Sequence, residues 1–378
     1  MQHWDIFCRV IDNYGDAGVC WRLAQQLTKE HNVQVRLWID NLPTLAHLVP
    51  GLLPDLPMQT ISPGLSVHAW DKDFSHAIPG QVVIGAFACD LPPAYLQAMA
   101  AQSPSPVWIN LEYLSAEDWV AGCHLLSSPH PLLGLTQYFF FPGFHTGGFL
   151  REANLYQRWK NWPQQKSGVH LPDQLMQEKE PTDLKISLFS YDNYALPSLL
   201  QAWANHPQRV HCFAPISSTL NHAKLFFDVP TLHVGQILAR GSLRFYVIPF
   251  VTQEHYDTLL WDCDLNFVRG EDSFVRAQFA GKPMVWHIYK QTEQAHLAKL
   301  NAFLEHYYRD LPPRAQQAVQ TFYLNWNQGE DCTAAWTSYV SELNTIKNHA
   351  QQWAEKLYAQ PDLTSQLYSF AQERLFKI

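Results

Sequence analysis

The sequence contains no apolar stretch of the ~20 residues that a membrane-spanning helix requires. Its N-terminus, Met1 to Asp5, has neither the basic segment nor the apolar run of a signal peptide. The seven cysteines are odd in number and scattered, and no two of them form a Cys-x-x-Cys pair. We therefore expect a soluble cytoplasmic protein with reduced thiols and no membrane partner.

Several motifs that mark common enzyme classes are also missing. There is no Gly-x-Gly-x-x-Gly, Walker, Gly-x-Ser-x-Gly or His-Glu-x-x-His pattern. These absences weaken a dinucleotide-binding interpretation and exclude the commonest hydrolases and nucleotide triphosphatases. Asp71–Asp73 and Asp262–Asp264 match a weak Asp-x-Asp metal pattern, but the second pair stands where a predicted strand begins, so we interpret it as structural. We expect no metal.

The composition is that of a globular protein with an acidic surface. Hydrophobic residues make up 47% of the 378 residues and charged residues 16%, and the net charge is −8. A chain of this length usually forms two domains. The negative field disfavours nucleic acid and favours a protein partner that presents a positive charge.

Short apolar runs alternate with segments of helical spacing in both halves of the chain, which predicts parallel sheets covered by helices. The predicted strands are residues 5–11, 33–39, 81–86 and 107–110, then 184–189, 209–213, 243–248, 265–268 and 283–286. The polar segment 156–181 is predicted to be a linker. The domains are therefore expected at 1–160 and 181–349, with a C-terminal helix at about 350–378 that packs back on the first.

An acidic segment, Asp12–Gly18, follows the first predicted strand. Ligands bind beyond the carboxyl ends of parallel strands, and Gly15 allows a ligand to approach the backbone closely. Asp12 and Asp16 in such a place suit a cationic or nucleophilic substrate. The alternative is structural, with Asp16 as a helix cap and Asp12 in an Asx turn.

A second segment, Arg269–Ser273, follows the predicted strand 265–268 and opens a helix. The free amides and the positive dipole end of a helix N-terminus bind phosphate, and Ser273 and Arg269 would add a hydroxyl and a charge. The alternative is an ordinary cap made by Asp272 or Ser273.

Two further loops follow predicted strands in the second half. Tyr191 would donate its phenol to a diphosphate, Phe250 would stack on a base, and Gln253 would hydrogen-bond to that base. A place in the core is the alternative for each aromatic ring.

Four strings together identify the chain as similar to the bacterial elongation factor P arginine rhamnosyltransferase family. They are residues 11–23 (IDNYGDAGVCWRL), 108–119 (WINLEYLSAEDW), 140–148 (FFPGF and TGG) and 266–274 (NFVRGEDSF). The resemblance spans both halves of the chain.

The resemblance implies a GT-B fold, with two Rossmann-like domains that face a cleft. It implies inverting, metal-independent transfer from dTDP-β-L-rhamnose, a co-substrate, to an arginine of elongation factor P, without a cofactor. The first domain would bind the acceptor. The second would bind the donor, with Phe250 and Gln253 at the thymine, Arg269 nearby, and Tyr191, Asp272 and Ser273 around ribose and diphosphate.

The same resemblance makes Asp12, Asp16 and Glu271 the candidate catalytic carboxylates and includes Gly15 in the donor site. A guanidinium has a pKa above ~12 and delocalised lone pairs, so it needs acids that hold it and accept its proton. Two alternatives remain: a GT-B transferase that uses a UDP-sugar on a small molecule or glycan, and a scaffold that binds elongation factor P without modifying it.

Overall fold

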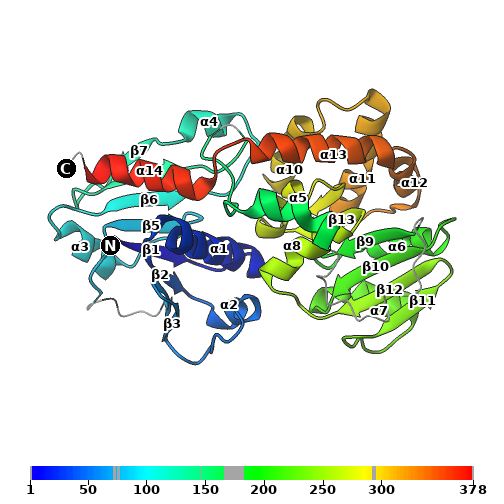
Figure 1. The fold of residues 1–378 in the computed structure, drawn as a ribbon, viewed down its shortest axis with the longest axis horizontal. Helices are drawn as coiled ribbons and strands as arrows, with labels where there is room; N and C mark the ends of the chain where they lie inside the picture. Colours follow the sequence, from blue (N-terminus) through cyan, green and yellow to red (C-terminus); the bar gives the residue numbers. More distant parts are fainter. Residues whose placement is uncertain are drawn as a thin grey trace. The chain divides into compact units, whose positions relative to one another are not determined.

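The protein is described by a computed structural model over residues 2–70, 74, 77–144, 146–165, 183–291 and 295–376. The chain divides into two compact units (Figure 1). Unit 1 comprises Met1–Leu155 and Gln360–Ile378, and unit 2 comprises Tyr156–Ala359. Each unit is built around one sheet.

The sheet of unit 1 has eight strands in the order β3-β4-β2-β1-β5-β6-β8-β7. The strands from β4 to β8 in this order are parallel, and β3 and β7 are antiparallel to their neighbours at the two edges. The bounds are β1 His3–Cys8, β2 Gln34–Ile39, β3 Met58–Ser62, β4 Leu65–Ala69, β5 Val82–Ala86, β6 Val107–Leu111, β7 Ser127–Pro129 and β8 Thr136–Phe140.

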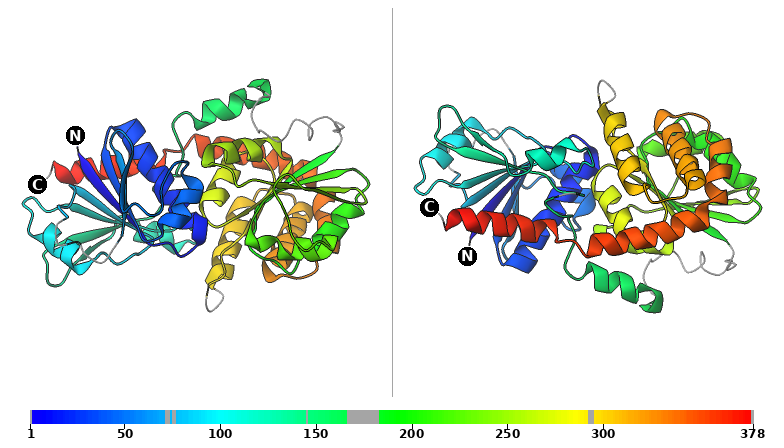
Figure 2. Two further views of the ribbon diagram at one scale, coloured as in Figure 1. Left: turned by 90° about the horizontal axis from the view of Figure 1, so that it is seen from below. Right: turned by 90° about the horizontal axis from the view of Figure 1, so that it is seen from above.

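Helices cover both faces of this sheet. Side chains of β1 point alternately to the two faces and contact a different helix on each. Trp4 stacks on Tyr368 of helix α14, whereas Phe7 packs edge-on against Tyr95 of α3. Helix α1 contacts both β1 and α14, and α14 lies along unit 1 in both views of Figure 2. The helices of unit 1 are α1 Asn13–His31, α2 Leu42–Leu48, α3 Pro93–Ala100, α4 Trp119–Cys123 and α14 Leu363–Leu375.

The sheet of unit 2 has six strands in the order β11-β12-β10-β9-β13-β14, and all are parallel except the edge strand β11. The bounds are β9 Leu184–Leu188, β10 Val210–Pro215, β11 Ile237–Arg240, β12 Leu243–Ile248, β13 Leu265–Arg269 and β14 Met284–His287. On one face Phe267 packs against Trp203 and Trp326, and on the other Asn266 hydrogen-bonds to the Leu260 carbonyl of α8.

Of the helices of unit 2, α5 precedes the first strand, and the others follow its strands or complete the unit after β14. Their bounds are α5 Leu155–Gln165, α6 Leu196–Ala204, α7 Asn221–Phe227, α8 Gln253–Asp262, α9 Asp272–Phe279, α10 Ala295–Tyr307, α11 Pro313–Gln328, α12 Thr333–Ser341 and α13 Leu343–Tyr358. The predicted α/β class is confirmed, and each predicted strand overlaps an observed one.

Three segments differ from expectation. The first part of the predicted linker is helix α5, and residues 166–182 lie outside the described residues. Residues 350–378, expected as one helix, contain the end of α13 in unit 2 and α14 in unit 1. Helix α1 begins at Asn13, so most of the acidic segment is its first turns. Among the described residues, no helix is both long and apolar enough to cross a membrane.

Candidate active site

The acidic segment of unit 1 lies where β1 ends and α1 begins, and its two carboxylates are buried. Asp12 is 8% exposed and Asp16 is 1% exposed. Asp16 Oδ2 accepts hydrogen bonds from the backbone N–H groups of Ile11 and Asp12, both at 2.8 Å. Tyr113 Oη donates to Asp16 Oδ1 at 3.0 Å. Both oxygens of Asp16 are therefore held in place.

Asp16 has a structural role at the start of α1. Its carboxylate accepts a hydrogen bond from the N–H of Asp12, which is itself the N-cap of α1, so Asp16 binds the cap residue and is not the cap that the alternative expected. Burial raises the pKa of Asp16, although the hydrogen bonds from Asp12, Ile11 and Tyr113 favour the charged form. A carboxylate with a raised pKa is a stronger base than one in water, which suits proton abstraction.

The neighbouring strand ends supply residues that the sequence did not single out. Tyr113 follows β6 and stacks on Phe87, with ring centroids 4.2 Å apart. Phe87 and Ala88 follow β5 with φ angles of 59° and 54°, the left-handed region that non-glycine residues rarely adopt. Phe87 has this unusual backbone conformation, and its ring stacks on Tyr113, the residue that donates a hydrogen bond to Asp16. Tyr113 stands within the string 108–119, which was the only sequence signal for it.

In unit 2, the loop after β13 leads directly into α9. Glu271 is the N-cap of α9 but makes no side-chain cap hydrogen bond, and its carboxylate lies 3.9 Å from Lys299 Nζ. Ser273 Oγ accepts from the Arg269 N–H at 3.1 Å and donates to the Arg269 carbonyl. The hydroxyl of Ser273 therefore closes the loop at the start of the helix, where the first amides of α9 have no acceptor within the helix itself.

Arg269 is held between two aromatic rings. Its guanidinium carbon lies 4.3 Å from the ring centre of Phe189 and 4.9 Å from that of Tyr191. Its Nη1 donates to the Ser190 carbonyl at 3.3 Å, and the residue is 6% exposed. Cation–π contacts of this kind orient a guanidinium and desolvate it. Arg269 thus fixes the position of Tyr191 as well as carrying charge.

The other predicted donor residues gather at the same edge. Gln253, the first residue of α8, donates from Nε2 to Asp272 Oδ2 at 2.9 Å. Phe250 is half-buried, and its ring lies edge-on to Phe189 at 6.1 Å. The structure therefore brings six predicted donor residues together beyond the carboxyl ends of β9, β12 and β13: Tyr191, Phe250, Gln253, Arg269, Asp272 and Ser273. Gly15, the seventh, lies in α1 of unit 1.

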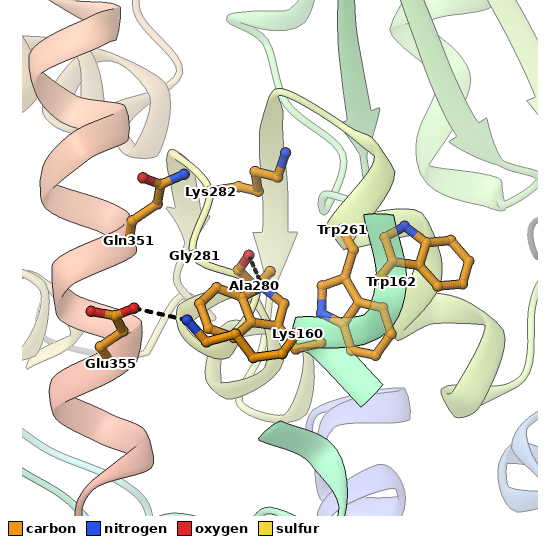
Figure 3. Close-up of a pocket in the computed structure, with 9 residues that line it drawn as sticks. Lys160, Trp162, Trp261, Ala280, Gly281, Lys282, Gln351 and Glu355 are labelled. Carbon is orange, nitrogen blue, oxygen red and sulfur yellow. Dashed lines mark hydrogen bonds and ion pairs between the residues drawn. The ribbon is translucent and has the colours of Figure 1, made fainter. Parts of the chain in front are cut away.

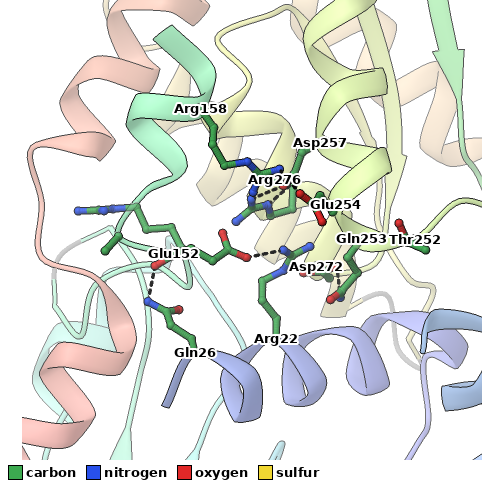
Figure 4. A network of polar contacts seen from close by, with 12 residues as sticks. Arg22, Gln26, Glu152, Arg158, Thr252, Gln253, Glu254, Asp257, Asp272 and Arg276 are labelled. Atoms are coloured by element: carbon green, nitrogen blue, oxygen red, sulfur yellow. Dashed lines mark hydrogen bonds and ion pairs between the residues drawn. The ribbon is translucent and has the colours of Figure 1, made fainter. Parts of the chain in front are cut away.

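A buried ion pair joins the two helices that begin at this edge. Arg276 of α9 donates from Nε and Nη2 to the two carboxylate oxygens of Asp257 of α8, at 2.8 and 2.6 Å (Figure 4). Both side chains are almost fully buried. The pair holds the start of α8 beside the start of α9, which carry Gln253 and Asp272. In unit 1 the same figure shows Arg22 bonded to Glu152 at 2.8 Å.

Unit 2 also has a pocket of about 330 Å³, drawn in Figure 3. Lys282 precedes β14 and Trp261 precedes β13, so this pocket lies at the edge where the strands begin. It contains none of the predicted site residues. Its lining residues are Trp159, Lys160, Trp162, Trp261, Ala280, Gly281, Lys282, Gln351 and Glu355.

One group among the described residues has carboxylate and imidazole atoms close enough for a metal ion: Glu30, His31 and Asp362, within 4.8 Å of one another. The carboxylates of Glu30 and Asp362 accept hydrogen bonds from the backbone. Glu30 accepts from the Ala153 N–H, and Asp362 caps α14 by accepting from the Ser365 N–H. This group lies at the far end of α1 from Asp16, about 22 Å away at 1.5 Å per residue.

The family model for the elongation factor P rhamnosyltransferase EarP matches residues 4–372. A protein-arginine rhamnosyltransferase of Pseudomonas aeruginosa is 44% identical over 376 residues, which cover 98% of this chain and 99% of that protein. The enzyme of the same name from Pseudomonas putida is 46% identical over 375 residues, with the same coverage of both chains.

Solved structures agree with this relationship. One, described as the structural basis for EarP-mediated arginine glycosylation of translation elongation factor EF-P, is 34% identical, with a TM-score of 0.69 and 99% coverage of both chains. MurG of Acinetobacter baumannii matches at 13% identity and a TM-score of 0.50 over 99% of this chain, a likeness of fold alone. The predicted GT-B fold and the glycosyltransferase class are confirmed. The chain belongs to the elongation factor P rhamnosyltransferase family.

Proposed function

We propose that this protein transfers rhamnose from dTDP-β-L-rhamnose to an arginine guanidinium of elongation factor P, with inversion at the sugar carbon. Family membership supports the transfer, since relatives at 44% and 46% identity are protein-arginine rhamnosyltransferases. The observation that best supports a guanidinium acceptor is the environment of Asp16. This residue is a buried carboxylate with a raised pKa at the carboxyl edge of a parallel sheet. An acid of this kind suits a cation that must lose a proton.

The donor would bind at the carboxyl edge of the sheet in unit 2. Phe250 would stack on the thymine and Gln253 would hydrogen-bond to it. Tyr191, Asp272 and Ser273 would surround the ribose and diphosphate. The clustering of these side chains around β9, β12 and β13 supports this assignment. Arg269 would place a positive charge near the diphosphate while it holds the ring of Tyr191.

The acceptor guanidinium would be held by carboxylates. Asp12 and Glu271 would orient it by charge-assisted hydrogen bonds, and Gly15 would let the donor sugar approach closely. In one displacement the guanidinium nitrogen forms a bond to the sugar C1 while the C1–O bond to dTDP breaks. Asp16 takes the proton that the nitrogen loses, so the reaction balances with dTDP as the leaving group.

The departing diphosphate gains negative charge as the C1–O bond breaks. The backbone amides at the start of α9 and the positive end of its dipole would stabilise that charge, with the Arg269 guanidinium nearby. We therefore propose a transfer that requires neither metal nor cofactor. Because the acceptor is a translation factor, the site of action would be the cytoplasm.

One experiment tests the proposed donor, the proposed acceptor and the transfer between them. Purified protein is incubated with elongation factor P and either dTDP-rhamnose or a panel of UDP-sugars. The intact mass of elongation factor P is then measured by mass spectrometry. A single deoxyhexose, added only with dTDP-rhamnose and located on an arginine by fragmentation, supports the proposal. Modification with a UDP-sugar instead would establish the other transferase class. Binding of elongation factor P without a mass change under every condition would establish the scaffold.

A further inference from the structure

His287 is the last residue of β14 and stands in register with Arg269, the last residue of β13. It is 2% exposed. Its ring lies edge-on to Tyr191 at 5.2 Å and to Trp326 at 5.6 Å. His287 therefore sits beside the predicted donor residues, at the carboxyl edge where ligands bind to parallel sheets.

The backbone around His287 is fixed on both sides by one residue of α11. Asn327 donates from Nδ2 to the Trp286 carbonyl at 2.9 Å, and its Oδ1 accepts from the Ile288 N–H at 3.0 Å. Trp286 in turn donates from Nε1 to the Gly270 carbonyl in the loop before α9. The imidazole is therefore held in one place relative to that loop.

The buried polar atoms at this edge that have no hydrogen-bond partner among the described residues include His287 Nδ1 and Ser190 Oγ. Ser190, which is 4% exposed, follows β9, and β9 and β14 are the two neighbours of β13. The two atoms therefore come from opposite sides of the strand that carries Arg269. A buried polar atom without a partner destabilises a fold, and an apolar ring would fill the place of His287 without that cost.

The surroundings of His287 keep its ring neutral. Burial lowers the pKa of His287 to about 3, and the nearby charges of Lys290, Arg269 and His296 act in the same direction. A neutral imidazole has one N–H, and a serine hydroxyl has one O–H. Both groups can donate a hydrogen bond to an oxygen that carries no proton, such as an ionised phosphate oxygen.

We infer that His287, through Nδ1–H, and Ser190, through its hydroxyl, donate hydrogen bonds to phosphate oxygens of the nucleotide-sugar donor. The inference rests on the proposed donor site and adds two contacts to it. Together with Arg269 and the start of α9, the two groups would surround the diphosphate with one charged and several neutral donors. The neutral donors would position the phosphates without adding net charge.

The test is calorimetric titration of the full-length protein with dTDP. His287→Phe keeps a ring of similar shape and removes the nitrogen, and Ser190→Ala removes the hydroxyl. Each should weaken dTDP binding about ten-fold, as expected for a hydrogen bond to a charged group, without lowering the Tm. His287→Asn places an amide near the position of Nδ1 and should recover affinity to within about three-fold of wild type.

Tyr339→Phe is the matched control. The Tyr339 hydroxyl is also buried without a partner among the described residues, but it lies in α12, away from the strand ends. This variant should bind dTDP as wild type does.

Wild-type affinity in both His287→Phe and Ser190→Ala would overturn the inference. So would equal losses of affinity and of Tm in both His287→Phe and His287→Asn, because they would assign His287 a purely structural role. Failure of the wild type itself to bind dTDP would instead overturn the proposed donor.

Discussion

Tyr113 donates a hydrogen bond to Asp16 Oδ1 at 3.0 Å, and its ring is stacked on Phe87. This bond favours the charged form of Asp16 and so opposes the effect of burial on its pKa. A residue whose only sequence signal was its family string thus lowers the pKa of the proposed catalytic base, against the larger effect of burial.

Tyr113→Phe should move the acidic limb of the pH profile of kcat/KM to higher pH. Loss of the hydrogen bond raises the pKa of Asp16 further, so a larger share of the enzyme is protonated at acidic pH. The rate on the acidic limb should fall about two- to ten-fold. Initial rates of acceptor modification across pH give the profile. An unchanged acidic limb would show that the Tyr113 hydroxyl does not affect the group whose ionisation the limb reports.

Asp16→Asn should remove most turnover and leave the fold intact. The amide oxygen can accept from the N–H groups of Ile11 and Asp12, while the amide nitrogen can donate to Tyr113 Oη. Loss of a general base typically costs about 10²- to 10⁴-fold in rate. The affinity for dTDP should stay near wild type, and equal loss of affinity and turnover would indicate a structural role.

The same variant should also change how stability depends on pH. The folded-state pKa of Asp16 is raised, so its contribution to stability is present below the unfolded pKa and lost as pH rises through the folded pKa. Asp16→Asn cannot ionise. The Tm of wild type relative to the variant should therefore decrease as pH rises from the ordinary carboxyl pKa of 3.8 through the raised pKa of Asp16, and thermal melts from acidic to neutral pH measure the difference.

Phe250→Ala should raise the Kd for dTDP by about five- to a hundred-fold, because stacking of a base on an aromatic ring contributes about 1–3 kcal/mol. Phe226→Ala is the control, since Phe226 is also a half-buried phenylalanine but belongs to α7. Calorimetry on both variants gives the comparison. Unchanged affinity in Phe250→Ala would refute the stacking assignment.

Arg276→Met should destabilise the protein by about 3–5 kcal/mol, because it leaves Asp257 buried without its bidentate partner. The double variant Arg276→Met, Asp257→Leu should recover much of that loss, since it buries no unpaired charge. Urea unfolding of the two variants and of Asp257→Leu completes the double-mutant cycle. Additive losses would show that the two side chains do not stabilise the fold as a pair.

The predicted linker shows why local pattern alone was insufficient. Residues 156–165 contain one proline and several polar residues with little periodicity, yet they form most of α5. The helix is stabilised by tertiary contacts: Trp159 Nε1 donates to the Ala280 carbonyl, and Trp162 Nε1 donates to Asp262. The two partners lie 121 and 100 residues away in the chain.

The glycine pair of the string 140–148 has a tertiary explanation as well. A Cβ on Gly147 would lie 2.1 Å from the Phe141 carbonyl oxygen, and one on Gly148 would lie 2.4 Å from that of Pro361. Both residues have φ near 70°. The pair therefore permits close backbone packing beside the start of α14, which no spacing within residues 140–148 reveals.

The sequence by itself determined the α/β class, the strands that carry the candidate residues, and the loops that follow them. Those features depend on local periodicity and on the rule that ligands bind beyond the carboxyl ends of parallel strands. Only the tertiary structure decided which side chains meet there. Tyr113 reaches Asp16 across 97 positions, and His287 lies beside Tyr191 because β14 and β9 both flank β13. Burial, which sets the pKa of Asp16 and of His287, arises from packing by the whole unit.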